Sequence, residues 1–226
     1  MDSKIVFLNS CNEIANQLGD FKIYEKGRRL KKVASDQDIF FELTFQTGFN
    51  NHSSHIMINP SMAIYSKSLK KWQIENIKSE FCTGLIYANH IGYITPLQTW
   101  KKWNLAGLSH EKSISEIVKN IQKFVFPIFK IFDAKETAVE FLKNKGTKFN
   151  PYCEDSLVPL AFLLCHADHE TSELFFNHYI ENSINKEKII SFFEKLKTDR
   201  EIDLNHSEFV DAAHIKLAFI NNLSLK

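Results

Sequence analysis

The sequence predicts an α+β protein, in which a small antiparallel sheet of about four strands in the N-terminal half packs with a helical C-terminal half. Apolar and polar residues alternate through residues 39–46 and again through 55–65, which is the period of a half-buried strand. Capping and stop signals divide the chain after residue 109 into a series of helices. With 226 residues, 44% of them hydrophobic, the chain is long enough to bury its own core.

The N-terminal half alternates between helices and strands. Strands are expected at residues 21–33, 39–46, 55–65 and 85–94, and helices at 5–18, 66–79 and from Thr95-Pro96 to near Gly107. Proline at a first helical position loses no needed hydrogen bond, which favours a helix start at Thr95-Pro96. Pro60 predicts that its strand is an edge strand or carries a bulge, because proline donates no ladder hydrogen bond.

The C-terminal half is expected to consist of helices. They are placed after Ser113, from Asp133 to Gly146, and near residues 155–166, 169–182, 186–198 and 207–222. Ser113 and Glu116 fit a capping box, and Pro127 should kink or split the helix that follows. Since no linker rich in proline, glycine or serine interrupts the chain, we expect one domain over residues 1–226, strand-rich over 1–108 and helical over 109–226.

The common catalytic motifs are absent from the sequence. No two of its seven glycines lie within five residues of each other, which excludes the P-loop, GxGxxG and GxSxG patterns. HExxH is also missing, and the four cysteines form no CxxC pair, so buried reduced thiols are expected. We therefore expect a protein without enzymatic activity and without a cofactor. An enzyme whose site is assembled from distant residues remains the alternative.

Charge is distributed unevenly along the chain, although the formal net charge is only +1. Residues 22–135 hold 17 lysines and arginines against 9 acidic residues, whereas residues 150–211 hold 5 against 13. If these charges form separate faces, the acidic segment is a docking surface for a basic protein partner; if they mix, that argument is lost. The candidate docking residues are Glu154, Asp155, Asp168, Glu170, Glu173, Glu181, Asp199, Glu201 and Asp203.

The basic segment suggests nucleic-acid binding as the alternative function. Its cations are Lys22, Lys26, Arg28, Arg29, Lys31 and Lys32, followed by Lys67, Lys70, Lys71, Lys101 and Lys102. Tyr24, Trp72, Trp100 and Trp103 offer rings on which bases stack. Against this function, the chain has only three arginines, and lysines also protect exposed sheet edges.

Two histidine pairs are candidates for metal ligands. His166 and His169 share a face if one helix continues through them, but Asp168 between them fits the N-cap of a new helix. His52 and His55 lie in a polar loop. Neither pair has a third ligand that the sequence identifies, so no metal site is expected.

Three segments of the N-terminal half carry a family resemblance. These are Phe21-Lys-Ile-Tyr-Glu-Lys-Gly-Arg-Arg-Leu-Lys-Lys32, Phe40-Phe-Glu-Leu-Thr-Phe-Gln46 and Tyr65-Ser-Lys-Ser-Leu-Lys-Lys-Trp72. Over roughly residues 15–110 the chain resembles bacterial proteins of the domain-of-unknown-function 4304 type. The resemblance implies a small α+β bacterial protein, and some proteins of this kind look like immunity partners of secreted toxins. It assigns no functional residues.

These observations together predict a cytoplasmic binding protein. The most concrete form is an immunity protein that occludes the active site of a cognate toxin. A secretory signal is not recognisable at the N-terminus, and the longest apolar runs are far shorter than a membrane span. We therefore expect a protein partner and no membrane association.

Overall fold

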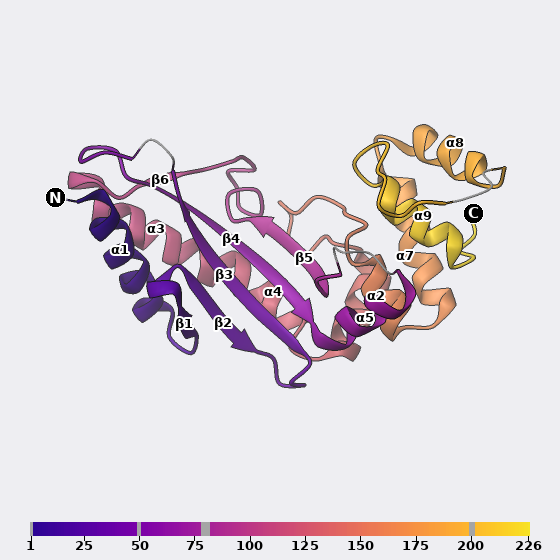
Figure 1. Cartoon of the computed structure of the whole chain (residues 1–226), viewed down its shortest axis with the longest axis horizontal. Coiled ribbons are helices and arrows are strands. Elements are labelled where there is room, and N and C mark those ends of the chain that lie inside the picture. The colour runs from indigo at the N-terminus through magenta and orange to yellow at the C-terminus, as the bar shows by residue number, and fades with distance from the viewer. Residues whose placement is uncertain (1, 49–50, 78–81, 199–201) are drawn as a thin grey trace. The chain divides into compact units, whose positions relative to one another are not determined.

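The computed structural model describes residues 2–48, 51–77, 82–198 and 202–226, and it confirms the α+β class. Its strands are β1 (Lys22–Tyr24), β2 (Arg29–Val33), β3 (Ile39–Thr47), β4 (Met57–Ser66), β5 (Leu85–His90) and β6 (Trp103–Asn104). Its α-helices are α1 (Ser3–Leu18), α2 (Lys67–Asn76), α3 (His110–Asn120), α4 (Phe126–Ile131), α5 (Lys135–Lys145), α6 (Leu160–His166), α7 (His169–Asn182), α8 (Lys186–Leu196) and α9 (Ala212–Ile220). Figure 1 shows the strands in the N-terminal half and a purely helical C-terminal half.

The strands form one sheet in the order β1-β2-β3-β4-β5, and β6 also pairs with β4. Neighbouring strands with short connections run antiparallel, as in β1 with β2 and β2 with β3. Lys31 stands opposite Lys22 on one side and opposite Glu42 on the other. The sheet therefore has more strands than the four expected, because β1 and β6 are too short to show alternation.

Pro60 does not mark a sheet edge, so the edge-strand prediction is wrong. β4 lies between β3 and β5, and its partner changes next to Pro60. β6 pairs with Met57 and Ile58, whereas the Pro60 carbonyl accepts the N–H of Ile91, directly after β5. The N and carbonyl of a strand residue point to the same side. The side of Pro60 that lacks an N–H therefore faces the point where the partner of β4 changes from β6 to β5.

The helix expected from Thr95-Pro96 is absent, and the strand before it ends at His90 rather than Ile94. The Thr95 hydroxyl donates to the Gly92 carbonyl, and the Gln98 N–H closes a turn on the Thr95 carbonyl. Trp103 then enters the core as part of β6, opposite Ile58. Burial of this large ring against β4 outweighs the local helix signal.

The expected break at Pro127 is confirmed, but the capping box at Ser113 is wrong. α3 is followed by a π-helical turn, η3 (Ile121–Val125), and α4 carries Pro127 in its first turn. α3 already begins at His110, and Ser113 lies inside it. Its hydroxyl donates to the Asn104 carbonyl at 2.7 Å, so it connects α3 to β6 instead of capping a helix.

The remaining helices lie close to their expected positions. α1, α2, α5, α7 and α8 each begin and end within a few residues of the prediction, while α6 and α9 are shorter. Asp168 caps α7, as expected, because its carboxylate accepts the Thr171 N–H at 2.7 Å. No described helix has both the length and the apolar character needed to cross a bilayer.

Contacts divide the chain into two compact units. Unit 1 contains residues 1–64, 88–133 and 150–153, and unit 2 contains residues 65–87, 134–149 and 154–226. α3 and α4 therefore belong with the strand-rich part and not with the later helices, and the chain passes between units within β4 and β5. A single domain stays a prediction, since compactness of each unit does not decide whether they fold together.

Candidate functional site

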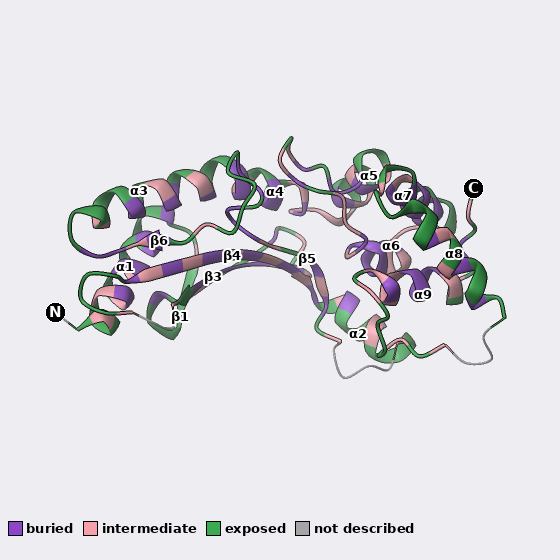
Figure 2. Ribbon diagram, turned by 90° about the horizontal axis from the view of Figure 1, so that it is seen from above, coloured by how far each residue is buried: buried purple, intermediate pink, exposed green. Residues whose placement is uncertain are grey.

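The helices that the structure describes in unit 1 cover one side of its sheet. Leu30, Phe41 and Leu43 are buried on the covered side, where the Phe41 ring stacks on Phe129 of α4 at 4.5 Å. Figure 2 shows α3 and α4 on this side of β3 and β4, and no described helix of unit 1 lies over the other side. We call the uncovered side the open face. Its residues are Lys22 and Tyr24 of β1, Arg29, Lys31 and Val33 of β2, Phe40, Glu42 and Thr44 of β3, and Asn59 and Ser61 of β4.

Ion pairs organise the charges of the open face. Glu42 is only 8% exposed, and its carboxylate lies 3.1 Å from the Lys31 ammonium and 3.4 Å from the Arg29 Nε. The second contact is an ion pair without the alignment of a hydrogen bond. Glu25, directly after β1, lies 3.3 Å from Arg29 and 3.5 Å from Arg28. Two carboxylates thus hold three cations in place and neutralise part of their charge.

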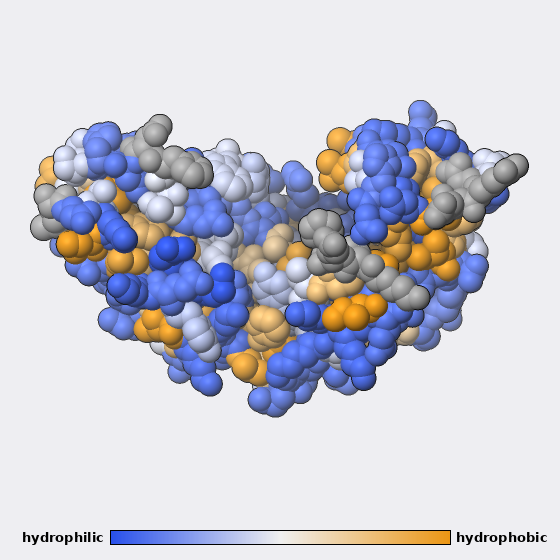
Figure 3. All heavy atoms as spheres, viewed as in Figure 1, coloured by the Kyte–Doolittle hydropathy of each residue, from blue (hydrophilic) through white to orange (hydrophobic). Residues whose placement is uncertain are grey.

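Aromatic and aliphatic side chains complete the open face. The Lys31 ammonium lies 5.7 Å from the centre of the Tyr24 ring and 5.6 Å from that of Phe40. Tyr24 is 45% exposed, and Val33 is also exposed on the same face. In Figure 3, which views this side, hydrophilic side chains gather over the middle of β2 and β3. The face therefore combines fixed charges with exposed apolar groups, and its tyrosine and arginine are residue types enriched in protein interfaces.

The expected basic residues do not form one surface. Lys22, Lys26, Arg28, Arg29 and Lys31 gather at β1 and β2, whereas Lys32 points to the covered side opposite Phe41. Lys67, Lys70 and Lys71 belong to α2 in unit 2. Of the tryptophans, Trp103 is core, Trp72 is half-buried and Trp100 is exposed.

Several of the expected acidic docking residues have structural contacts instead. Asp155 pairs with Lys148 at 3.2 Å, Asp168 caps α7, and Glu173 is buried beside Lys226 at 2.8 Å. Hydrogen bonds from Lys226 and the Ser224 N–H lower the pKa of Glu173 to about 2. Exposed members are Glu154, Glu170, Glu181 and Asp203, while Asp199 and Glu201 lie outside the described residues.

The opposed charges of the two chain segments are not divided cleanly between the two units. Unit 1 holds 13 basic and 10 acidic residues, and unit 2 holds 15 and 17. The acidic segment shares unit 2 with the basic helices α2 and α5. The two units therefore differ little in net charge, and an acidic docking surface within unit 2 stays a prediction.

The two histidine pairs have other partners. The His166 ring lies 3.1 Å from the Ser68 hydroxyl, and the His169 ring lies 3.2 Å from the Asn222 carbonyl. His52 and His55 form an isolated bridge with stacked rings. Within the described ranges, no three histidine, cysteine or acidic side chains group as metal ligands.

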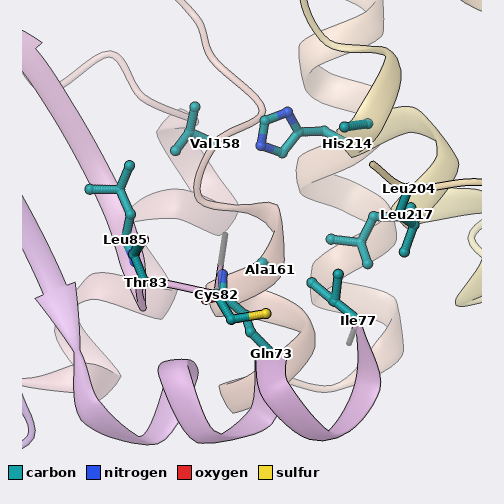
Figure 4. A pocket seen from close by; sticks show the side chains of 11 residues that line it. Gln73, Ile77, Cys82, Thr83, Leu85, Val158, Ala161, Leu204, His214 and Leu217 are labelled. Atoms are coloured by element: carbon teal, nitrogen blue, oxygen red, sulfur yellow. The ribbon is translucent and has the colours of Figure 1, made fainter. Parts of the chain in front are cut away.

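Unit 2 contains a cavity of about 240 Å³ that the sequence did not indicate (Figure 4). Its walls are mostly apolar, with Ile77, Leu85 and Leu217 among them, and Cys82 and His214 also line it. Burial lowers the pKa of His214, so its imidazole is neutral near pH 7. In Figure 4 the Cys82 sulfur points toward Ile77, whereas His214 lies at the other end near Val158. This arrangement lacks the thiol–imidazole contact of a cysteine nucleophile.

No family model matches the chain, and neither the curated proteins nor the solved structures give a match. Sequence reasoning identified Tyr24 and the cations of the open face, but it missed Glu42 and Phe40. The sequence did contain the pattern that could have identified these two residues. The alternation over residues 39–46 places Phe40, Glu42 and Thr44 on the face opposite the core.

Proposed function

We propose that the chain is a non-enzymatic binding protein and that a protein partner docks on the open face of unit 1. The observation that carries the proposal is the Glu42 cluster, in which a nearly buried carboxylate holds Arg29 and Lys31 on a sheet face that no described helix of the unit covers. Such a cluster presents its charges in fixed positions, so little side-chain entropy is lost when a partner binds. Tyr24 and Val33 beside it supply apolar contact area.

A protein suits this face better than a nucleic acid does. Phosphates require cations that are free to replace counterions, but Arg28, Arg29 and Lys31 already face Glu25 and Glu42. A polyanion would also meet those two carboxylates. A protein surface with both acidic and basic groups complements this mixture, while Lys22, which pairs with no described carboxylate, favours an acidic group opposite β1.

The more specific form of the proposal is an immunity protein whose partner is a toxin. The resemblance to the domain-of-unknown-function 4304 type supports this form, and so does the lack of a catalytic arrangement at Cys82 and His214. Inhibition would be stoichiometric, because the partner's active site is covered rather than modified. The partner would carry its acidic groups where they meet Lys22 and Tyr24.

Two matched double variants test the docking face. Lys22→Glu with Tyr24→Ala alters exposed residues of the open face, and Lys186→Glu with Ile184→Ala makes the same kinds of change on the exposed surface of unit 2. Candidate toxins encoded next to this protein are co-expressed with each form, and growth and co-purification are measured. The wild type and the unit 2 variant should protect cells and bind at one to one, and the open-face variant should lose at least tenfold in affinity.

Equal binding by both variants would place the partner elsewhere, and absence of protection by the wild type would remove the toxin-inhibitor role. A gel-shift assay with single-stranded RNA and DNA at about 50 mM salt addresses the alternative. Binding that weakens steeply with salt and is lost in the open-face variant would replace the protein partner with a nucleic acid.

A further inference from the structure

A second pocket lies in unit 1 on the covered side of the sheet, away from the open face. It has a volume of about 280 Å³ and lies beside Phe21, Phe41, Phe126 and Phe129. Phe41 comes from β3, Phe126 and Phe129 from α4, and Phe21 from the segment between α1 and β1. Three elements that are far apart in the sequence therefore build an aromatic wall at one place.

The four rings form a continuous, nearly parallel series. Phe21 stacks on Phe126 with 20° between the ring planes, Phe126 on Phe129 with 29°, and Phe129 on Phe41 with 15°. Phe41 and Phe129 are buried, whereas Phe21 and Phe126 are half-buried and border the opening. The outer rings therefore offer flat apolar surface to a planar group.

Two lysines and two carboxylates line this pocket, and they differ in how firmly they are paired. Lys130 in the last turn of α4 is exposed and makes no ion pair with the described part of the chain. Lys32 has only a loose contact with Asp20, at 3.8 Å. Asp133 is engaged instead, because it accepts both the backbone N–H and the hydroxyl of Ser35, at 3.1 and 2.6 Å. Lys130 thus remains for an anionic group, Lys32 can exchange its loose contact with Asp20 for one, and both oxygens of the Asp133 carboxylate already accept hydrogen bonds.

From these contacts we propose that unit 1 binds a small aromatic carboxylate in this pocket. Its ring lies against the half-buried rings of Phe21 and Phe126, and its carboxylate pairs with Lys130 and Lys32. The volume fits such a molecule, since a cavity of about 150 Å³ holds benzene and the remaining space takes a carboxylate with one or two linking carbons. This site lies on the opposite side of the sheet from the open face, so it does not depend on the proposed function.

The class of ligand is tested by titrating the full chain with three probes and recording two-dimensional NMR spectra at each step. Phenylacetate carries the ring and the negative charge, benzylamine carries the ring with a positive charge, and acetate carries the negative charge alone. Phenylacetate should bind with a Kd on the order of 1 mM, as expected for about ten non-hydrogen atoms. The other two should bind at least tenfold more weakly, and shifts should centre on the amides of α4 and β3.

Two substitutions locate the site. Lys130→Gln should weaken phenylacetate binding about fivefold, because an ion pair at the mouth is lost, whereas Lys119→Gln on the exposed side of α3 should leave it unchanged. Phe126→Leu keeps an apolar side chain but removes the ring face, and it should also weaken binding. Equal or tighter binding of benzylamine, no binding of any probe at 10-fold the expected Kd, or binding unaffected by both Lys130→Gln and Phe126→Leu would each overturn the proposal.

Discussion

At the scale of single residues, Gly84 shows how residues far away in the sequence can require a glycine at one position. It adopts a φ of +76°, and a Cβ at this position would lie 2.3 Å from the Ser66 carbonyl oxygen and 2.9 Å from Lys70 Cβ. Its own N–H donates to the Gln73 side chain at 2.9 Å, and its carbonyl accepts the Ser66 N–H at 2.8 Å. Both backbone groups are thus fixed against the start and the middle of α2, and no side chain fits there.

We expect Gly84→Ala to lower the free energy of unfolding by about 3 kcal/mol, from the strained φ and from the displaced backbone of Ser66. Gly107→Ala is the matched control, because Gly107 has a similar φ of +54° but a Cβ there would meet no described atom within 4 Å. This control should lose only about 1 kcal/mol. Urea unfolding of both variants measures the difference, and equal losses would contradict the close approach.

At the scale of elements, the ends of helices show which hydrogen bonds depend on neighbouring residues and which depend on tertiary contacts. Asp2, Ser66 and Asp168 cap their helices with side chains that accept a backbone N–H two or three residues later. The expected cap at Asp168 rests on this local geometry and is confirmed, and α2 begins directly after Ser66, close to its expected start. Ser113 offers the same local signal, yet its hydroxyl is used in a tertiary contact with the Asn104 carbonyl.

Ser113→Ala distinguishes the two roles. If Ser113 were a cap, its loss would fray the start of α3. If it makes a tertiary contact, its loss leaves α3 intact, because alanine favours helix, but weakens the attachment of β6 to α3. We expect the second result, with a loss of about 1 kcal/mol in the free energy of unfolding and a change in fluorescence of the neighbouring Trp103. Ser115→Ala, exposed on the same helix, should have no such effect. Faster amide exchange confined to the first turn of α3 would favour the cap.

At the scale of the whole molecule, each unit contains a histidine whose pKa burial lowers. His90 in unit 1 is 5% exposed, and burial, together with the charge of Lys102, lowers its pKa to about 4. Its Nδ1 accepts the Gly92 N–H, and its ring stacks on Trp100 at 4.4 Å. His214 in unit 2 has its pKa lowered by burial, which the nearby Asp211 partly opposes.

Acid should therefore destabilise the protein before its carboxylates titrate. Between pH 6.5 and about 4, the unfolded chain binds a proton at position 90 that the folded chain does not, so the free energy of unfolding falls as the pH falls, by about 1–3 kcal/mol from His90 alone. His90→Asn keeps a hydrogen-bond acceptor but does not titrate, and it should flatten this dependence. Chemical unfolding followed by tryptophan fluorescence is the measurement.

A wild-type free energy of unfolding that stays constant from pH 6.5 to 4 would contradict the buried neutral state of His90. Two separate transitions in the same experiment would indicate that units 1 and 2 unfold independently, and one transition would support the single domain that the sequence predicts.

The sequence by itself determined the class of fold, most helix positions and the break at Pro127, because these depend on periodicity, capping and proline geometry within a few residues. It also contained the alternation that separates Phe40 and Glu42 from the core. Only the tertiary structure decided that Trp103 forms a strand, that Ser113 contacts β6, and that α2 of the basic segment lies in the same unit as the acidic segment. These depend on contacts between residues far apart in the chain, and there burial of large side chains and ion pairing outweigh local preference.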